Sequence, residues 1–148
     1  MDAATNKEKK SVGLGVVARD STGKFVAAAV KTSQFHGDVT FAEAEAVEWG
    51  LQLAKTLGVS SIIVETDSQT VSNLLNSKAG SRTEVFWVIS EVQDLAKEFG
   101  KIRIQYIPRI CNAHAHLLAK SAFDYDEPAV WMGTFPENIL YLLQSLNE

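Results

Sequence analysis

The chain has 148 residues, of which 46% are hydrophobic and 22% are charged, and its formal net charge at pH 7 is −4. A core of about this length buries roughly 70% of the surface of the unfolded chain, so one domain is expected. The composition excludes intrinsic disorder and a collagen-like repeat. We expect a single domain over residues 1–148, with its core in 1–123 and a connector and apolar C-terminal helix in 124–148.

No apolar run approaches the roughly 20 residues that a spanning helix needs, and the first ten residues lack an apolar export signal. The single cysteine, Cys111, cannot form an internal disulfide and fits a reducing compartment. The sequence therefore predicts a soluble, intracellular protein. Residues 1–31 carry a net charge of +3 and residues 32–148 a net charge of −7. Two interpretations of this asymmetry remain open: a basic edge that contacts phosphate, or charge that only keeps the protein in solution.

The first predicted elements are two β-rich runs, at residues 11–19 and 24–31. Turn-forming residues at 20–23 join them, which predicts an antiparallel hairpin. Gly13 and Gly15 lie inside the first run and do not open a helix, so they do not indicate a dinucleotide-binding loop.

The rest of the chain alternates between helices and strands. The pattern predicts a helix at 41–57, started by Thr40 and ended by Gly58, a strand at 61–66, and helices at 68–76 and 84–99. A strand at 102–107, a helix at 112–123, an irregular connector at 124–135 and a helix at 136–146 follow. This alternation predicts an α/β fold in which helices cover a parallel or mixed sheet.

Glu43 is an acidic residue in the middle of the apolar arc of the predicted helix 41–57. A carboxylate that faces the sheet costs several kcal/mol of desolvation unless a cation, a metal or hydrogen bonds compensate it. Two interpretations stay open. Glu43 either closes a capping box with Thr40 at the start of the helix, or serves a functional site.

Asp67 stands at the carboxyl end of the predicted strand 61–66, just before a helix, where ligands bind in open α/β sheets. An N-cap for the following helix explains it equally well. His114 and His116 lie about 160° apart around one helix, so the pair does not indicate a zinc site. Asp2 is too close to the terminus for its pattern to be informative.

Five blocks carry a resemblance: MDAATN, VGLGVVARDSTGKF, FAEAEAVEWGLQLAKTLG, IIVETDSQTV and IPRICNAHAHLLAKSA. In this order they resemble the ribonuclease H type 1-like domain, and most closely its plant, retroelement-derived, reverse-transcriptase-like branch. The resemblance covers almost the whole chain. It implies a five-stranded mixed sheet with three antiparallel strands first, flanked by helices. It also implies an endoribonuclease that hydrolyses the RNA strand of RNA:DNA hybrids with two Mg²⁺ ions, or with Mn²⁺.

The resemblance also implies site residues. Asp2, Glu43 and Asp67 match the family's metal-binding carboxylates, and the fourth such position falls on His116. These four are the expected catalytic residues and metal ligands. The expected contacts to the hybrid are Ser68 and Gln69, with Thr40 and Asn6 as weaker matches.

Two features depart from the family. The neutral imidazole of His116 is a poorer Mg²⁺ ligand than a carboxylate, which predicts weaker binding of the second metal and a relative gain with Mn²⁺. Asp2 should end a first strand of about seven residues, yet only Met1 precedes it. We therefore expect a truncated first strand, so that either the chain is a fragment or another segment or chain fills the gap.

A second class of function remains open beside the enzyme, namely a catalytically silent ribonuclease H-like module that binds nucleic acid or protein. A protein partner or self-association would use the incomplete sheet or the C-terminal helix. The apolar residues of that helix are Ile139, Leu142, Leu143 and Leu146.

Overall fold

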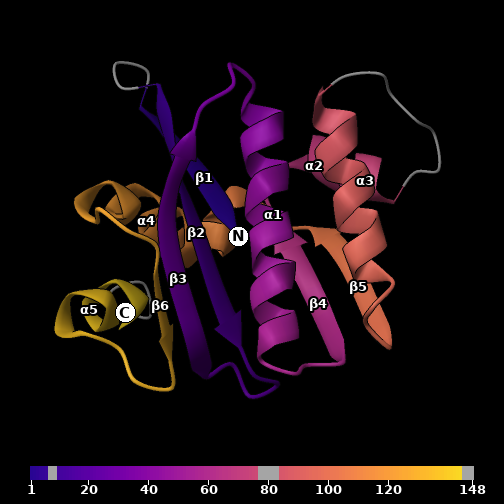
Figure 1. Ribbon diagram of the computed structural model, residues 1–148. Helices are drawn as coiled ribbons and strands as arrows, with labels where there is room; N and C mark the ends of the chain where they lie inside the picture. Colours follow the sequence, from indigo (N-terminus) through magenta and orange to yellow (C-terminus); the bar gives the residue numbers. More distant parts are fainter. Residues whose placement is uncertain (7–9, 77–83, 145–148) are drawn as a thin grey trace.

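The computed structural model describes residues 1–6, 10–76 and 84–144. It contains strands and helices in the mixed order expected for an α/β protein (Figure 1). The strands are β1 (Asp2–Asn6), β2 (Ser11–Arg19), β3 (Phe25–Gln34), β4 (Ser61–Thr66), β5 (Lys101–Tyr106) and β6 (Ala129–Met132). The helices are α1 (Val39–Thr56), α2 (Gln69–Leu75), α3 (Glu84–Ala96), α4 (Ala113–Ser121) and α5 (Glu137–Gln144), with short 3-10 turns at Arg109–Asn112 and Ala122–Asp124.

The strands form two separate sheets. β1, β2, β3 and β6 make an antiparallel sheet in that order, and β4 and β5 make a parallel pair. The predicted hairpin of β2 and β3 and the three antiparallel strands at the start are confirmed. The expectation of one five-stranded sheet is wrong for the described residues, because no hydrogen-bonded ladder joins β1 to β4.

The first strand differs from its prediction. Asp2 begins β1 rather than ending it, and β1 pairs with β2 from Asp2 opposite Gly15 to Asn6 opposite Ser11. β1 is therefore an edge strand of its sheet, with all of its pairing on one side. Met1 lies beside α1, where its side chain contacts Gly50.

Helices cover both faces of the antiparallel sheet (Figure 1). On one face, Val12, Leu14 and Val16 of β2 pack against small and aromatic residues of α1. On the other face α4 lies directly on β2, because a Cβ at Gly13 or Gly15 would collide with the backbone of α4 at Ala119. The two glycines thus serve close helix–sheet packing, in agreement with their interpretation as strand residues.

A second core joins α1 and α3 to the parallel pair. Val47 and Leu51 of α1, Val64 of β4 and Val92 of α3 are fully or almost fully buried together. This packing attaches β4 and β5 to the rest of the domain through helices rather than through strand hydrogen bonds. It therefore sets where the carboxyl end of β4 lies relative to α1.

Three local predictions need correction. The connector 124–135 is not irregular throughout, because β6 pairs within it to Ala27–Val30 of β3. Helix α1 begins two residues earlier than expected, at Val39. Its N-cap is Asp38, whose carboxylate accepts a hydrogen bond from the Thr40 backbone N–H at 2.8 Å, so Thr40 does not start the helix.

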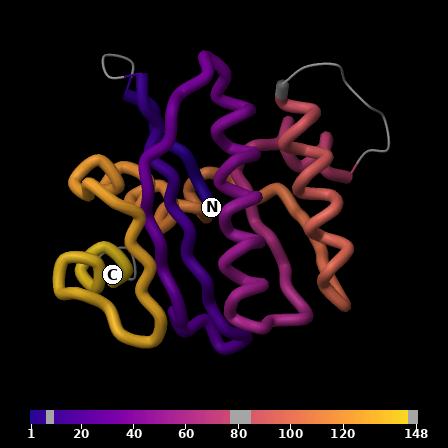
Figure 2. Tube along the Cα trace, viewed as in Figure 1, coloured from indigo at the N-terminus to yellow at the C-terminus, as the bar shows by residue number. Residues whose placement is uncertain are grey.

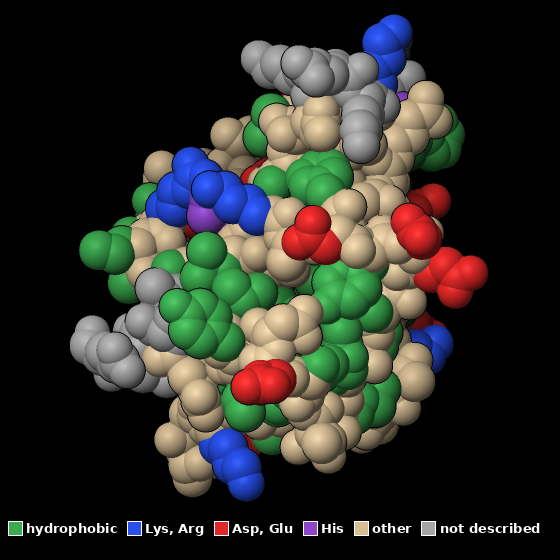
Figure 3. All heavy atoms as spheres, turned by 90° about the vertical axis from the view of Figure 1, so that its left-hand side faces the viewer, with side chains coloured by type: hydrophobic (Ala, Val, Ile, Leu, Met, Phe, Trp, Pro, Cys, Tyr) green, Lys and Arg blue, Asp and Glu red, His purple; other side chains and the backbone are tan. Residues whose placement is uncertain are grey.

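The C-terminal helix also differs from its expected role. Ile139 and Leu143 of α5 are buried against β3 and α4, so these two apolar residues belong to the core and not to a partner surface. Leu142 packs at the edge of this cluster, and Leu146 lies outside the described residues. On this side of the molecule, the hydrophobic side chains at the surface form several groups, with polar side chains and backbone atoms between them (Figure 3).

The N-terminus lies in the middle of the fold beside α1, and the C-terminal end of the described chain lies with α5 at its outer side (Figure 2). Within residues 1–6, 10–76 and 84–144, no helix is long and apolar enough to cross a lipid bilayer.

Candidate metal centre

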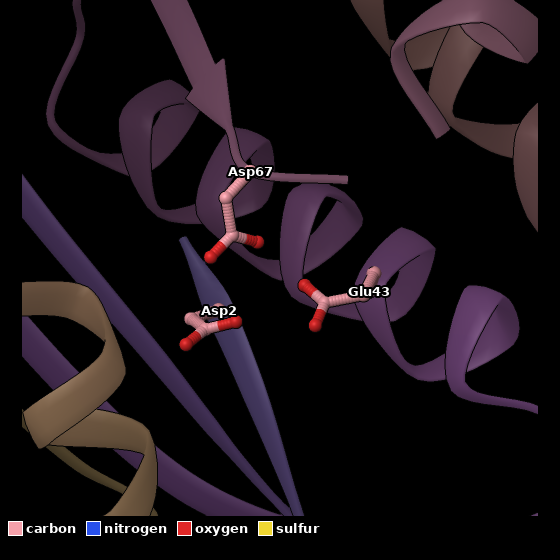
Figure 4. Close-up of side chains that lie close together, drawn as sticks. All are labelled: Asp2, Glu43 and Asp67. Carbon is pink, nitrogen blue, oxygen red and sulfur yellow. The ribbon is translucent and has the colours of Figure 1, made fainter. Parts of the chain in front are cut away.

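Three carboxylates from three separate elements meet beside α1. Asp2 is the first residue of β1, Glu43 lies early in α1, and Asp67 follows the last residue of β4. Their side chains point toward one another (Figure 4). One oxygen atom from each lies within 4.8 Å of the others. The structure thus brings together three of the four ligands that the resemblance implies.

The chain around Asp67 frees its carboxylate for this cluster. Ser68, not Asp67, is the N-cap of α2, because its Oγ accepts a hydrogen bond from the Val71 N–H at 3.2 Å. Thr66 Oγ1 accepts from the Ser68 N–H at 3.1 Å, which holds the turn between β4 and α2. The capping interpretation of Asp67 is therefore wrong.

The capping interpretation of Glu43 fails as well, because Asp38 occupies the N-cap position of α1. Glu43 is buried, and its Oε2 atom has no hydrogen-bond partner among the described residues. A buried acceptor without a partner is costly and rare in a folded protein. The Oε2 atom of Glu43 is therefore available to a cation or to a hydrogen-bond donor.

The electrostatics of the cluster point the same way. Burial, together with the negative charge and hydrogen bond of Asp2, raises the pKa of Glu43 to about 9. Burial and Asp2 also raise the pKa of Asp67, while a hydrogen bond from Asn112 and the positive charge of Arg109 oppose that shift. Carboxylates this close repel one another unless a cation neutralises them, and their hard oxygen atoms suit Mg²⁺ or Mn²⁺.

His116 lies next to the cluster but outside the group of three. Its Nδ1 is 2.7 Å from Oδ2 of Asp2, and Arg109 Nη2 lies 3.2 Å from both ring nitrogens. Since an ionised carboxylate only accepts hydrogen bonds, the consistent arrangement has Nδ1–H donating to Asp2 and Nε2 accepting from Arg109. In the structure, therefore, the imidazole orients Asp2.

Sequence reasoning missed two residues of this site. Asn112 is buried, and its Nδ2 donates to the backbone carbonyl of Met1 at 2.8 Å as well as bonding to Asp67. Arg109 contacts His116 and places a positive charge close enough to lower the pKa of Asp67. The sequence predicts Asn112 only as the first residue of the helix 112–123, and no local pattern indicates its contacts with Met1 and Asp67.

The four residues expected to contact the hybrid lie at different distances from the carboxylate cluster. Ser68 and Gln69 directly follow Asp67 at the start of α2, where Gln69 is exposed. Thr40 lies in the first turn of α1, ahead of Glu43. Asn6 lies at the other end of β1 from Asp2, about 13 Å along the strand. The contacts of all four with nucleic acid remain predictions.

The fold and the cluster together define a ribonuclease H-like α/β domain. The crystal structure of RNase H1 from Halobacterium salinarum NRC-1 superposes with a TM-score of 0.75 at 25% identity, over 83% of this chain and 93% of that one. The N-terminal RNase H domain of a Mycobacterium tuberculosis protein gives 0.73 at 23% identity, over 83% and 89%. LC11-RNase H1, solved in complex with an RNA/DNA hybrid, gives 0.73 at 20% identity, over 83% and 93%.

The family itself follows from the sequence. A family model described as reverse transcriptase-like matches residues 1–122, and the chain belongs to this family. Comparison with curated protein sequences gives no significant match. The ribonuclease H-type resemblance is thereby confirmed, while its plant, retroelement-derived branch remains a prediction.

Proposed function

We propose that this chain is a metal-dependent endonuclease that hydrolyses the RNA strand of RNA:DNA hybrids. The observation that carries the proposal is the convergence of Asp2, Glu43 and Asp67 in a member of this family. A structural neighbour solved with an RNA/DNA hybrid supports the choice of substrate. The partner is then a nucleic acid rather than a small molecule.

Asp2, Glu43 and Asp67 are the residues that would hold two Mg²⁺ ions, with Mn²⁺ as the alternative. Bound there, the ions would supply activation of the attacking water and stabilisation of the leaving oxygen in an in-line displacement. The protein's own part is to hold three carboxylates together before the metal arrives. Asn112 and Arg109 support this arrangement by lowering the cost of ionising Asp67.

His116 is proposed to act on the site through Asp2 and, if its ring turns toward the cluster, as the fourth ligand. An imidazole binds Mn²⁺ more readily than Mg²⁺, so we expect a higher relative activity with Mn²⁺. His116→Asp should shift the preference back toward Mg²⁺. Equal activity with both ions, unaltered by His116→Asp, would contradict this role.

Recognition of the hybrid is proposed to rest on its shape and on the 2′-hydroxyls of the RNA strand, so cleavage should depend little on sequence. Ser68 and Gln69 are the nearest expected contacts to the sugar–phosphate backbone, because they adjoin Asp67. Thr40 and Asn6 would extend the contact surface along α1 and β1. Arg109 adds a positive charge beside the cluster.

The test is cleavage of an end-labelled RNA:DNA hybrid in Mg²⁺ and, separately, in Mn²⁺. Asp67→Asn should lower the rate by about a thousandfold, since several kcal/mol of metal-derived stabilisation is lost. Glu48→Gln, a matched acid-to-amide change on α1 outside the cluster, should leave the rate within about twofold. Cleavage that survives Asp67→Asn would contradict the proposal.

A catalytically silent module that binds nucleic acid is the second candidate. It is favoured by the placement of His116, which replaces a carboxylate and already holds Asp2 in a hydrogen bond. In the same assay this candidate predicts no cleavage with either ion by the wild-type protein, together with retained binding of the hybrid in a gel-shift measurement.

A further inference from the structure

Two exposed cations lie on one side of the carboxylate cluster. Arg109, in the 3-10 turn before α4, contacts the ring of His116 at 3.2 Å, and His116 in turn contacts Asp2. Lys120 follows His116 by four residues on α4, so the Cβ atoms of the two side chains are neighbours on one face of the helix, roughly 6 Å apart. We call Arg109, His116 and Lys120 together the α4 strip. It leads from the cluster toward the C-terminal end of α4.

The positive charges of the α4 strip are available to an external anion. Arg109 and Lys120 are both exposed. Among the described residues, neither forms an ion pair with a carboxylate, whereas Arg19, Lys55 and Lys97 do. Figure 3 shows Lys and Arg side chains gathered around a histidine on the face where α4 lies. In a chain whose formal net charge is −4, this is a local concentration of positive charge.

The position of the α4 strip relates it to the proposed contacts of the hybrid. His116 contacts Asp2, so the strip begins on the side of the cluster that Asp2 forms. Ser68 and Gln69 follow Asp67, so they lie on the side of the cluster that Asp67 forms. A nucleic-acid strand that extends from Gln69 across the cluster therefore continues over the α4 strip.

We infer that the α4 strip binds phosphates of the RNA strand on the Asp2 side of the cut, an inference that rests on the proposed function. Phosphates of one strand follow one another about every 3.4 Å along the axis of a duplex. Cations that are one helical turn apart, about 5.4 Å, therefore match roughly two consecutive phosphates. Arg109 faces the phosphate next to the cluster, and Lys120 faces a phosphate one or two linkages farther along the strand.

Lys120 is the residue that separates this role from others. Arg109 also contacts His116, so replacing it would change the surroundings of Asp2 as well as any phosphate contact. Lys120 is exposed and has no ion pair with the cluster, so its charge acts on the reaction only through the substrate. A contact that is equally strong in the ground state and the transition state changes KM and leaves kcat unaltered.

The first measurement is the steady-state cleavage of an RNA:DNA hybrid by the full chain. Lys120→Gln should raise KM by about three- to tenfold and leave kcat within about twofold. Lys120→Arg keeps the charge and should keep KM within about twofold of the wild type. Lys24→Gln is the matched control, because Lys24 is an exposed lysine in the turn between β2 and β3. Equal KM values for Lys120→Gln and Lys24→Gln would overturn the inference.

The salt dependence of KM counts the contacts that are lost. Each phosphate that a protein cation neutralises releases condensed counterions, so log KM rises with the logarithm of the salt concentration. Lys120→Gln should lower this slope by about one, and Lys24→Gln should leave it as in the wild type. A slope for Lys120→Gln equal to that of the wild type would contradict a phosphate contact at Lys120.

The closing experiment locates the phosphate. Cleavage is confined to one place by a strand in which a short ribonucleotide stretch is flanked by deoxyribonucleotides, and neutral methylphosphonate linkages are placed one at a time on either side of the cut. One linkage, on one side only, should raise the KM of the wild type as much as Lys120→Gln does, and should raise the KM of Lys120→Gln no further. If the two changes add at every position, Lys120 contacts no phosphate and the inference is wrong.

The failure of this inference is distinguishable from failure of the proposed function. If the wild type cleaves the hybrid and Lys120→Gln has the same KM, only the α4 strip is wrong. If the wild type does not cleave, the proposed enzyme is wrong, and the same proteins and modified strands are compared by the Kd for the hybrid in a gel-shift measurement. A Kd of Lys120→Gln equal to that of the wild type, or no binding by the wild type, would then overturn the α4 strip as well.

Discussion

Helix α1 contributes to two acidic clusters that differ in geometry. Glu43 joins Asp2 and Asp67, three buried or half-buried carboxylates from three elements that converge within 4.8 Å. Farther along the same helix, Glu48 faces Glu91 of α3 in a second cluster that also includes Asp94 and Glu98. Both clusters are thus made of carboxylates. The cluster around Glu43 differs because its three carboxylates come from three separate elements and converge on one another.

The two clusters respond differently to their surroundings. Burial and Asp2 raise the pKa of Glu43 to about 9, and burial and the hydrogen bond of Glu91 raise the pKa of Glu48 only to about 7. Glu48 is partly exposed, so solvent screens the repulsion between its carboxylate and those of its neighbours. This cluster therefore has less need of a cation than the cluster around Glu43. Among the described residues, only the first cluster brings three ligand atoms this close.

The largest expected effect is on catalysis. Glu43→Gln removes one ligand from the converging cluster and should lower the rate of hybrid cleavage by about a thousandfold. Glu48→Gln makes the same chemical change on the same helix and should leave the rate within about twofold. Both effects are measured as initial rates of hybrid cleavage in Mg²⁺. An equal loss of rate in the two variants would contradict a special role for the cluster around Glu43.

A smaller loss is expected at His116. His116→Ala removes the hydrogen bond to Oδ2 of Asp2 and should lower activity by about tenfold to a hundredfold, as for other residues that orient a metal ligand. The control is His36→Ala, at an exposed imidazole outside the cluster. If the two variants have the same rate, His116 does not orient Asp2.

The third effect is on the stability of the metal-free protein. The folded-state pKa of Glu43 lies above its unfolded value of 4.5. The contribution of Glu43 to the free energy of unfolding is therefore fully present below pH 4.5 and is lost as the pH rises toward 9. Glu43→Gln should therefore raise the free energy of unfolding at pH 8 in EDTA by roughly 2 kcal/mol. Urea unfolding measures the free energy of unfolding of both proteins. A variant less stable than the wild type would contradict the repulsion between Glu43 and the carboxylates of Asp2 and Asp67.

The smallest effect is expected at Glu48. Its raised pKa of about 7 also makes the folded state less stable as the pH rises from its unfolded value of 4.5 through 7. Since this side chain is partly exposed, Glu48→Gln should flatten the dependence of the unfolding temperature on pH only slightly. A change as large as that of Glu43→Gln would show that the second cluster is as strained as the first.

Several parts of the site were predictable because they depend on local pattern. The position of Glu43 on the apolar arc of its helix indicated a carboxylate that needs compensation, and the place of Asp67 after a buried strand indicated a ligand site. The structure agrees with both and removes their capping alternatives.

Other parts depend on contacts between distant segments, which local pattern does not reveal. β6 is a short strand that forms only against β3, and its sequence between two turns gives little periodicity. The link from Arg109 through His116 to Asp2 joins residues that lie more than 100 positions apart in the sequence. The separate pair of β4 and β5 was likewise not predicted, because the resemblance implied one five-stranded sheet.

The most direct test of the central claim is metal binding itself. Mn²⁺ titrated into the metal-free protein and followed by electron paramagnetic resonance should show saturable binding in the wild type and in Glu48→Gln. The same titration should show almost none in Glu43→Gln. Binding of Mn²⁺ by Glu43→Gln as strong as that of the wild type would contradict the assignment of Asp2, Glu43 and Asp67 as the metal centre.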